Sequence, residues 1–361
     1  MEKNNQKNNQ NYYDIAIVGA GPAGATFAKL LAEQKPDLKI VLLHDHQPER
    51  QKPCGGLLSP DAQKKLAEHQ ITLPKEILAD PQIFAVRTVD LKQNLDCTYQ
   101  RHYLNMDRYA FDEWLISLIP NKTTIMRQRY IKVIREDNDF ILTLSSGQVL
   151  RSHYLVAADG AGSSIRRTFF PEKKTNNYTA IQQWFKRKDF DRAEFYCVFD
   201  PETSDSYSWF FNKNEYIVYG GAFPKQNSRE LFEAQKSKFA KQMNYDLSDL
   251  VRTEACQVVF PRKFNEFFLG KENIFLLGEA AGLISASSFE GISYAIDSAE
   301  KLANAFAKVP IHSKPMKYYQ NAMRKMKIKL WLKMHKRNIL CQPFLRRLIM
   351  KSKITAINLK E

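Results

Sequence analysis

Short apolar runs alternate with helix-like stretches through much of the chain. Residues 14–18 and 40–43 are mainly apolar runs, and residues 25–34 between them have helical spacing of their apolar positions. Further apolar runs occur at 154–158 and 273–277. Runs of this length are typical of buried parallel strands. The strand–helix–strand order therefore predicts an α/β unit with a parallel sheet.

Two other stretches, 82–101 and 177–221, alternate loosely between apolar and polar positions and predict antiparallel strands of a separate layer. The second stretch is dense in Tyr and Trp, which favour sites with one apolar and one wet end. We expect one face of its sheet to line a large apolar pocket. A sheet that packs only against the core is the alternative. Aromatic residues expected at the pocket include Trp184, Tyr207, Trp209 and Tyr219.

A glycine-rich turn, GAGPAG at 19–24, joins the first predicted strand to the first predicted helix. In the G-x-G-x-x-G spacing, Gly19 permits a tight turn, Gly21 lets the backbone approach a pyrophosphate, and Gly24 lets helix and strand pack closely. The N-terminus of the helix offers N–H groups and a partial positive charge to phosphates. We predict a dinucleotide site; an ordinary glycine-rich turn is the alternative.

An acidic residue follows the second predicted strand. Such sites usually have an acid there that accepts hydrogen bonds from a ribose hydroxyl. Asp45 lies slightly late for this position, after a lengthened loop at 35–37. Asp45 is the candidate, and His44 in the ribose position is the alternative.

The stretch Pro53-Cys54-Gly55-Gly56 predicts a loop whose backbone comes close to another group. That group could be the face of a bound ring. A plain turn with a buried cysteine explains the same residues equally well.

Arg108 lies in the first turn of a predicted helix that Asn105 or Asp107 can cap. Cations are disfavoured at a helix N-terminus. The position therefore favours a functional partner for Arg108, such as a phosphate.

Two further turns follow apolar runs. Asp159 and Gly160 end the run at 154–158, and the sequence GEAAG at 278–282 ends the run at 273–277. Small residues at such turns allow a backbone to meet a ligand. Gly291 begins another predicted helix whose free N–H groups could face an anionic or carbonyl-rich ring edge.

Composition limits the class of protein. The chain has 361 residues, of which 44% are apolar and 26% charged, as in globular proteins. Residues 1–11 predict a disordered tail without the apolar core of a signal peptide, and no apolar run is long enough to span a bilayer. The five cysteines are scattered, which favours a reducing, cytoplasmic compartment over a disulfide framework or zinc site. We therefore expect no metal.

The net charge of +15 is concentrated near the C-terminus. Residues 314–353 contain thirteen Lys or Arg and no Asp or Glu. Within them, 323–340 predicts a basic amphipathic helix that contains Trp331. This pattern favours peripheral contact with an anionic membrane, at its inner face. A packed helix with a solvated basic face is the alternative, and nucleic acid is disfavoured because no recognised nucleic-acid module accompanies the charge.

Taken together, the separated motifs resemble a known family. The turn at 19–24, Asp159-Gly160 with Ser163 and Arg166, and the turn at 278–282 are similar to the signature of single-Rossmann flavoproteins of the aromatic-hydroxylase type. Further motifs resemble the geranylgeranyl reductase branch, and the similarity covers nearly the whole chain. These motifs are KPCGG at 52–56, Arg108 with Phe111-Asp112, Tyr207 with Trp209, and Glu290-Gly291-Ile292.

The resemblance implies an α/β fold, α+β overall, with a discontinuous Rossmann-type FAD-binding domain, an antiparallel β-sheet substrate domain and a helical C-terminus. The FAD-binding domain would comprise 12–80, 102–172 and 265–310, the substrate domain 81–101 and 173–264, and the basic helical segment 311–361. FAD would contact Gly19, Gly21, Ala23, Gly24, Asp45, Cys54, Gly55, Gly56, Arg108, Asp159, Gly160, Gly278, Glu279, Gly282, Gly291 and Ile292. Tyr207 and Trp209 would line an elongated apolar pocket.

The implied activity is the reduction of C=C bonds in a prenyl-type, isoprenoid substrate by reduced FAD. Cys54 and Tyr207 are the candidate proton donors. Only one dinucleotide fold is predicted, so NAD(P)H or a protein electron donor would dock transiently. The chain departs from the family pattern at Glu279, where the family has Asp, at Asn212, and at Ala286 and Phe289. A flavin monooxygenase and a lipid-binding flavoprotein with little turnover are the alternatives.

Overall fold

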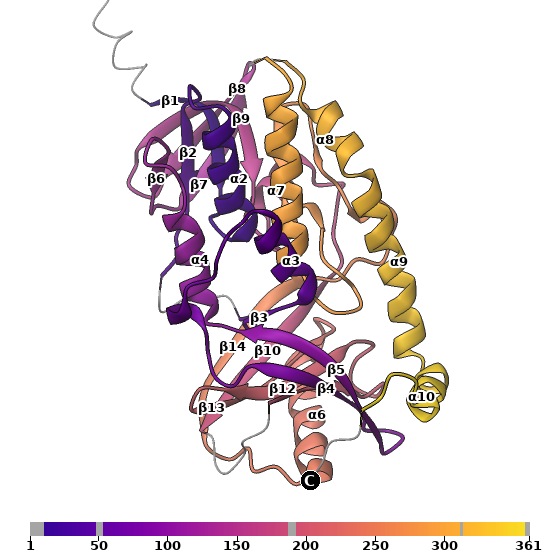
Figure 1. The fold of residues 1–361 in the computed structure, drawn as a ribbon. Coiled ribbons are helices and arrows are strands. Elements are labelled where there is room, and N and C mark those ends of the chain that lie inside the picture. Colours follow the sequence, from indigo (N-terminus) through magenta and orange to yellow (C-terminus); the bar gives the residue numbers. More distant parts are fainter. Residues whose placement is uncertain (1–10, 48–52, 187–192, 311–312, 358–361) are drawn as a thin grey trace, which may run out of the picture.

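The computed structural model describes residues 11–47, 53–186, 193–310 and 313–357. The predicted tail lies outside the described residues except for Asn11, and Lys52 of the KPCGG motif lies outside them as well. Two sheets lie one above the other in Figure 1, with the C-terminal helices along one side of both.

The first sheet contains the parallel strands that the apolar runs predict. Its order is β15-β16-β9-β1-β2-β6, and the pairs from β16 to β6 are parallel. β7 and β8 extend it as an antiparallel hairpin on β9. The strands are β1 (Tyr12–Val18), β2 (Ile40–Leu43), β6 (Thr124–Met126), β7 (Tyr130–Glu136), β8 (Asp139–Leu144), β9 (Val149–Ala157), β15 (Gly270–Lys271) and β16 (Ile274–Leu276).

Helices cover the first sheet because each carries an apolar face. α2 (Pro22–Gln34) buries Phe27 and Leu31 and packs against α7 (Ile292–Ala307). β1 supplies the other half of this core, since Ile15 and Ile17 are completely buried. α4 (Arg108–Ser117) lies on the other side of α2 in Figure 1. The parallel strands and their helices confirm the predicted Rossmann-type arrangement.

The second sheet has the order β14-β10-β13-β12-β11-β4-β5-β3. Its pairs are antiparallel except for β11 with β4, which is parallel. α6 (Ser228–Met243) covers one face, where Phe232 and Phe239 pack against the sheet. The strands are β3 (Leu57–Leu58), β4 (Ile83–Asp90), β5 (Leu95–Asn105), β10 (Asn177–Lys186), β11 (Glu194–Phe199), β12 (Tyr207–Lys213), β13 (Tyr216–Phe223) and β14 (Leu250–Val259).

The remaining helices are short or C-terminal. α8 (Met316–Ala322), α9 (Arg324–Cys341) and α10 (Pro343–Ser352) run along the side of both sheets in Figure 1. In the described part of the chain, no helix has the length and apolar character needed to cross a membrane. The other elements are α3 (Pro60–Glu68), α5 (Ser164–Phe169) and the 3₁₀ turns η2 (Lys75–Ile77), η3 (Phe264–Glu266) and η4 (Gly278–Ala281).

Candidate functional site

One cavity of about 690 Å³ is lined by residues from both sheets. It brings together most of the residues that the sequence singles out, although they are spread over more than 270 positions of the chain. The predicted residues that line it are Gly19, Gly21, Ala23, Asp45, Cys54, Gly55, Arg108, Asp159, Gly160, Tyr207, Trp209, Glu279, Gly291 and Ile292. Gly24, Gly56, Gly278, Gly282, Trp184 and Tyr219 do not line it.

The glycine-rich turn between β1 and α2 has the geometry that its spacing predicts. Gly19 has a positive φ of 98°, and a Cβ there would overlap the carbonyl oxygen of Ala158. A Cβ on Gly24 would overlap the carbonyl oxygen of Gly19, so Gly24 lets the helix approach the turn. A Cβ on Gly21 would meet no atom within 4 Å and would project into open space. The turn therefore leaves a cradle beside the N-terminus of α2 that a side chain would fill.

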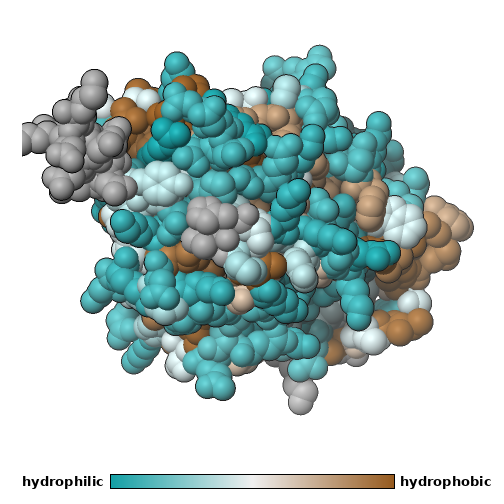
Figure 2. Space-filling view, turned by 90° about the horizontal axis from the view of Figure 1, so that it is seen from above, coloured by the Kyte–Doolittle hydropathy of each residue, from teal (hydrophilic) through white to brown (hydrophobic). Residues whose placement is uncertain are grey.

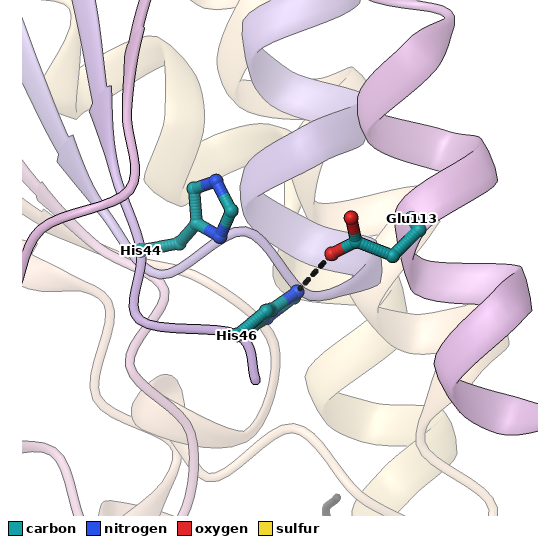
Figure 3. A group of neighbouring side chains, drawn as sticks. All are labelled: His44, His46 and Glu113. Carbon is teal, nitrogen blue, oxygen red and sulfur yellow. Dashed lines mark ion pairs between the residues drawn. The ribbon is translucent and has the colours of Figure 1, made fainter. Parts of the chain in front are cut away.

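Two histidines follow β2 at the same end of the cavity. His44 and His46 flank Asp45 and lie near Glu113 of α4, as Figure 3 shows. His46 Nδ1 is 3.4 Å from Glu113 Oε1, and one potential ligand atom from each of the three residues lies within 4.8 Å of the others. Burial and His46 lower the pKa of His44 to about 4, so its ring is neutral at physiological pH. These atoms could hold a metal ion or accept hydrogen bonds from ribose hydroxyl groups.

Arg108 begins α4, which Asp107 caps by accepting a hydrogen bond from the N–H of Ala110 at 2.8 Å. The guanidinium of Arg108 donates to both carboxylate oxygens of Asp112 at 3.1 Å. Burial disfavours its charge, but Asp112 and Cys54 outweigh that effect and raise the pKa of Arg108. Asp112 is thus the partner of the Arg108 charge within the protein, while a contact between Arg108 and a phosphate stays a prediction.

Asp159 lies in the turn after β9 with its two carboxylate oxygens in different surroundings. Oδ2 accepts a hydrogen bond from the N–H of Ser164 at 2.9 Å, at the start of α5. Oδ1 is buried and has no hydrogen-bond partner among the described residues. Burial raises the pKa of this carboxyl group. Asp159 lines the cavity, and Oδ1 is the carboxylate oxygen that no described residue engages.

The turn at 278–282 differs from the expectation for Gly278 and Gly282. Both have positive φ, and a Cβ on Gly282 would approach the carbonyl oxygen of Glu266 within 2.6 Å. A Cβ on Gly278 would crowd Ala23. These glycines therefore serve close packing within the protein and do not line the cavity. Glu279 does line it, with Oε1 accepting a hydrogen bond from the N–H of Val259 at 2.9 Å.

The loop at 53–56 rests on Lys213, a residue that the sequence analysis missed. Lys213 Nζ donates to the carbonyl oxygens of Gly55 and Met106 at 2.9 and 2.6 Å, and to Asn105 Oδ1 at 3.1 Å. Burial lowers the pKa of Lys213 to about 8. Gly56, with φ of 65°, faces this amine and not the cavity. The available signal was a lone lysine at the end of the aromatic strand YSWFFNK.

Tyr207 and Trp209 of β12 form part of the cavity wall. Tyr207 donates its hydroxyl hydrogen to the carbonyl oxygen of Ser288 at 2.6 Å, and burial raises its pKa well above the usual value. Trp209 donates from Nε1 to Gln182 Oε1 at 3.1 Å. Tyr103 and Phe195 extend the aromatic wall, and the sequence analysis had not singled them out for this role.

Trp184 and Tyr219 are corrections to the predicted pocket. Tyr219 points to the opposite face of the sheet, where its hydroxyl donates to Gln235 of α6 at 3.1 Å. Trp184 lies four residues along β10 from Ala180, a residue that lines the cavity, and so about 13 Å away along the strand. Its Nε1 donates to Glu254 Oε2 at 3.0 Å.

Glu290 lines the cavity just before α7. Its Oε1 accepts from the N–H of Ser293 and its Oε2 from the Ser293 hydroxyl, both at 2.8 Å. This carboxylate therefore caps the helix that presents Gly291 and Ile292 to the cavity. Burial raises its pKa.

Comparisons with known proteins agree with this architecture. Protein CbrA of Escherichia coli O1:K1 is 42% identical over 352 residues, covering 96% of this chain and 95% of the relative. A geranylgeranyl bacteriochlorophyll reductase-like protein from Thermoplasma acidophilum has a TM-score of 0.79 at 18% identity, covering 96% of this chain and 94% of that one. PqsL, a probable FAD-dependent monooxygenase from Pseudomonas aeruginosa, has a TM-score of 0.69 at 16% identity, covering 95% and 99%.

The two structural matches show the fold, which is the Rossmann-type α/β fold that the motifs predict. The sequence matches go further, because they extend over nearly the whole chain. Residues 14–358 match the family model described as lycopene cyclase protein. The chain therefore belongs to the lycopene cyclase protein family, with CbrA among its relatives and the fold of FAD-dependent oxidoreductases.

Proposed function

We propose that this protein is an FAD-dependent oxidoreductase that reduces C=C bonds of an apolar, prenyl-type substrate, as a member of a geranylgeranyl reductase-like group. One observation carries the proposal. A single cavity is lined both by the glycine-rich turn at the N-terminus of α2 and by the aromatic wall of Tyr103, Phe195, Tyr207 and Trp209. A dinucleotide cofactor and an apolar substrate would thus share one cavity.

The residues at the first-sheet end suit FAD. Gly21 leaves room for a pyrophosphate, and the first N–H groups of α2 face the same cradle. Asp45, or His44 in its neutral form, would accept hydrogen bonds from the adenosine ribose. Asp159 Oδ1 would accept one from a hydroxyl of the cofactor chain, which accounts for its lack of a protein partner.

The start of α7 suits the other end of the cofactor. Gly291 and Ile292 line the cavity where the helix offers its first N–H groups. These donors, with the partial positive charge of the helix N-terminus, would stabilise negative charge on the flavin ring. Glu290 keeps this terminus in place through Ser293.

When bound, reduced FAD supplies a hydride to one carbon of the double bond. The protein must then provide a proton to the other carbon and exclude water from the site. Cys54 and Tyr207 both line the cavity and carry a transferable proton. The hydroxyl of Tyr207 donates to the carbonyl oxygen of Ser288, and its pKa is raised. The Cys54 thiol accepts a hydrogen bond from the N–H of Gly56 at 3.5 Å and lies beside Arg108. Both groups therefore stay candidate proton donors. NAD(P)H or a protein donor would reduce the flavin transiently.

A flavin monooxygenase is the second candidate, since the similar solved structures include a probable FAD-dependent monooxygenase. Both reactions would use the same cavity, so the product decides between them. A lipid-binding flavoprotein with little turnover is a third outcome.

The test begins with the visible absorption spectrum of the purified protein after addition of FAD. The proposal is supported if the flavin bands bleach on anaerobic addition of NADPH. It is further supported if a prenyl substrate, added in the absence of oxygen, then gives a product with two more hydrogen atoms. A product that gains an oxygen atom only in air shows a monooxygenase. Bound flavin without turnover under either condition is the result expected of a lipid-binding flavoprotein. Protein that retains no flavin at any FAD concentration overturns the cofactor assignment itself.

A further inference from the structure

The outer surface of α9 carries a second apolar stripe in addition to its core-facing one. Met326, Leu330 and Met334 are buried against the protein, as an amphipathic helix requires. The exposed stripe contains Ile328, Leu332 and Ile339, which recur at helical spacing on the opposite side, and Leu332 is 55% exposed. Trp331 is exposed at the edge of this stripe. Packing within the chain therefore explains only half of the apolar residues of this helix.

α10 continues the same kind of surface. Arg346 and Met350 are buried, whereas Phe344, Leu345, Leu348 and Ile349 are exposed, with Phe344 at 70%. Of the nineteen large apolar residues exposed in the described chain, ten lie between Tyr318 and Ile354. Figure 2, seen from above, shows apolar atoms gathered on the side where α9 and α10 run in Figure 1. Such a concentration marks an interaction surface.

The charges around this surface specify its partner. Of the thirteen basic residues at 314–353, four pair with acidic residues elsewhere: Lys329 and Lys333 with Asp61, Arg337 with Asp205, and Arg346 with Asp90. Within the described residues, the other nine form no ion pair, and Arg347 and Lys351 flank the apolar face of α10. With no acidic residue at 314–353, the surface combines exposed apolar side chains with uncompensated positive charge.

We propose that α9 and α10 form a docking surface for an anionic lipid bilayer, with Trp331, Phe344 and Leu348 entering the interface and the surrounding lysines and arginines contacting lipid phosphates. Apolar side chains flanked by basic ones are the pattern of interfacial helices. A second copy of this chain fits less well, because two surfaces without acidic residues would repel each other. Nucleic acid would leave the aliphatic side chains without partners.

The surface is fixed to the body of the protein and lies close to the cavity. Arg346 Nε donates to Asp90 Oδ2 at 2.7 Å, which ties α10 to β4. The guanidinium of Arg337 lies 4.9 Å from the ring centre of Phe260, whose ring is 5.5 Å from that of Phe289 in the cavity wall. Delivery of a lipid substrate from the bilayer to the cavity would follow, and only this consequence rests on the proposed function.

Co-sedimentation of the full chain with vesicles tests the docking surface. We expect binding at low salt to vesicles of phosphatidylcholine mixed with phosphatidylglycerol, little binding to phosphatidylcholine alone, and release at high salt. Arg347→Gln with Lys351→Gln should weaken binding about twenty-five-fold, since each basic residue near an anionic leaflet raises affinity about five-fold. Phe344→Ala with Leu348→Ala should weaken it about ten-fold or more.

Matched controls use exposed residues elsewhere. Phe84→Ala removes an aromatic residue that is 66% exposed on β4, and Lys122→Gln with Lys225→Gln removes two exposed charges; neither should alter vesicle binding. Circular dichroism and FAD titration report folding and cofactor binding separately, so loss of flavin does not bear on the docking surface. Equal binding to neutral vesicles, or no binding at low salt, overturns the proposal. So does a dimer that the variant Phe344→Ala with Leu348→Ala dissociates while its vesicle binding is unchanged.

Discussion

The side-chain nitrogen of Lys213 lies 2.9 Å from the carbonyl oxygen of Gly55, so the last residue of β12 supports the loop that carries Cys54. The same nitrogen reaches Met106 and Asn105 at the end of β5. Three acceptors around one buried cation explain why a lysine is tolerated inside the protein. The second sheet thereby fixes the position of a loop at the cavity.

Replacing Lys213 by Met should change how stability depends on pH. Burial lowers the pKa of Lys213 to about 8, below its ordinary value of 10.5. Between these values the unfolded chain binds more protons, so Lys213 makes stability rise as pH rises, by at most about 1.4 kcal/mol per pH unit. Urea unfolding of the wild-type protein and Lys213→Met from pH 7 to about 10 should show this slope only in the former. Identical slopes would contradict the low pKa.

Gly21 and Gly24 should respond differently to the same substitution. Gly21→Ala places a methyl group in open space, so stability without FAD should change by no more than about 1 kcal/mol. The methyl group would occupy the cradle and raise the Kd for FAD about ten-fold or more. Gly24→Ala forces the helix away from Gly19 and should destabilise the protein by about 1–3 kcal/mol.

Thermal unfolding without FAD and fluorescence titration with FAD measure the two effects. If Gly21→Ala bound FAD normally, the cradle would not be the cofactor site. If Gly24→Ala unfolded at the wild-type temperature, the close contact would be unimportant for stability.

Asp159→Asn should weaken FAD binding while keeping the fold. The remaining oxygen of the amide can still accept the hydrogen bond from Ser164, so we expect a stability change within about 1 kcal/mol. The amide nitrogen would replace Oδ1 and could not accept a hydroxyl hydrogen, which should cost about ten-fold or more in affinity.

The pH dependence of FAD affinity independently tests whether Asp159 contacts the cofactor. Burial raises the pKa of this carboxyl group, so the charged acceptor of the wild-type protein is lost at a higher pH than an exposed aspartate would be. Wild-type affinity should therefore fall as the solution is acidified, and Asp159→Asn should show a smaller fall. Equal pH profiles would indicate that Oδ1 does not face the cofactor.

Arg346→Ala should destabilise the protein much more than Arg347→Ala. The side chains of Arg346 and Asp90 are 3% and 0% exposed, and removing one partner of a buried ion pair costs about 3–5 kcal/mol. Arg347 is exposed, so its loss should cost no more than about 0.5 kcal/mol. Urea unfolding of the two variants gives the comparison, and equal midpoints would show that α10 is not held by this pair.

The sequence predicts the β1–α2 unit well because its determinants are local. Gly24 packs against Gly19, five residues earlier, and the strand and helix periods are visible in the flanking residues. Gly278 and Gly282 show where this reasoning fails. A glycine that faces a ligand and a glycine that faces another part of the protein look alike in sequence. Here the close neighbours are Ala23, far away along the chain from Gly278, and the backbone of Glu266 in a separate turn.

The aromatic sheet illustrates a second limit. The pairing of Phe210 with Tyr219 places Trp209 and Tyr219 on opposite faces of the sheet, but only the position of α6 decides which face becomes core and which becomes cavity wall. Lys213 was missed for the same reason, since its partners Gly55 and Asn105 lie more than a hundred residues earlier. In the C-terminal region, helical spacing predicts α9. Only the structure shows which of its two apolar stripes packs against the protein and which is exposed.

The late entry of β16 into the first sheet has a consequence for protein synthesis. β9 is completed as an interior strand only when Ile274–Leu276 pairs with Leu155–Ala157, and Leu155 and Val156 are then fully buried. A nascent or prematurely terminated chain that lacks β16 would present an apolar, unpaired edge, which invites aggregation. Soluble protein in a cell should therefore consist of full-length molecules, with truncated products recovered in inclusion bodies or removed by proteases.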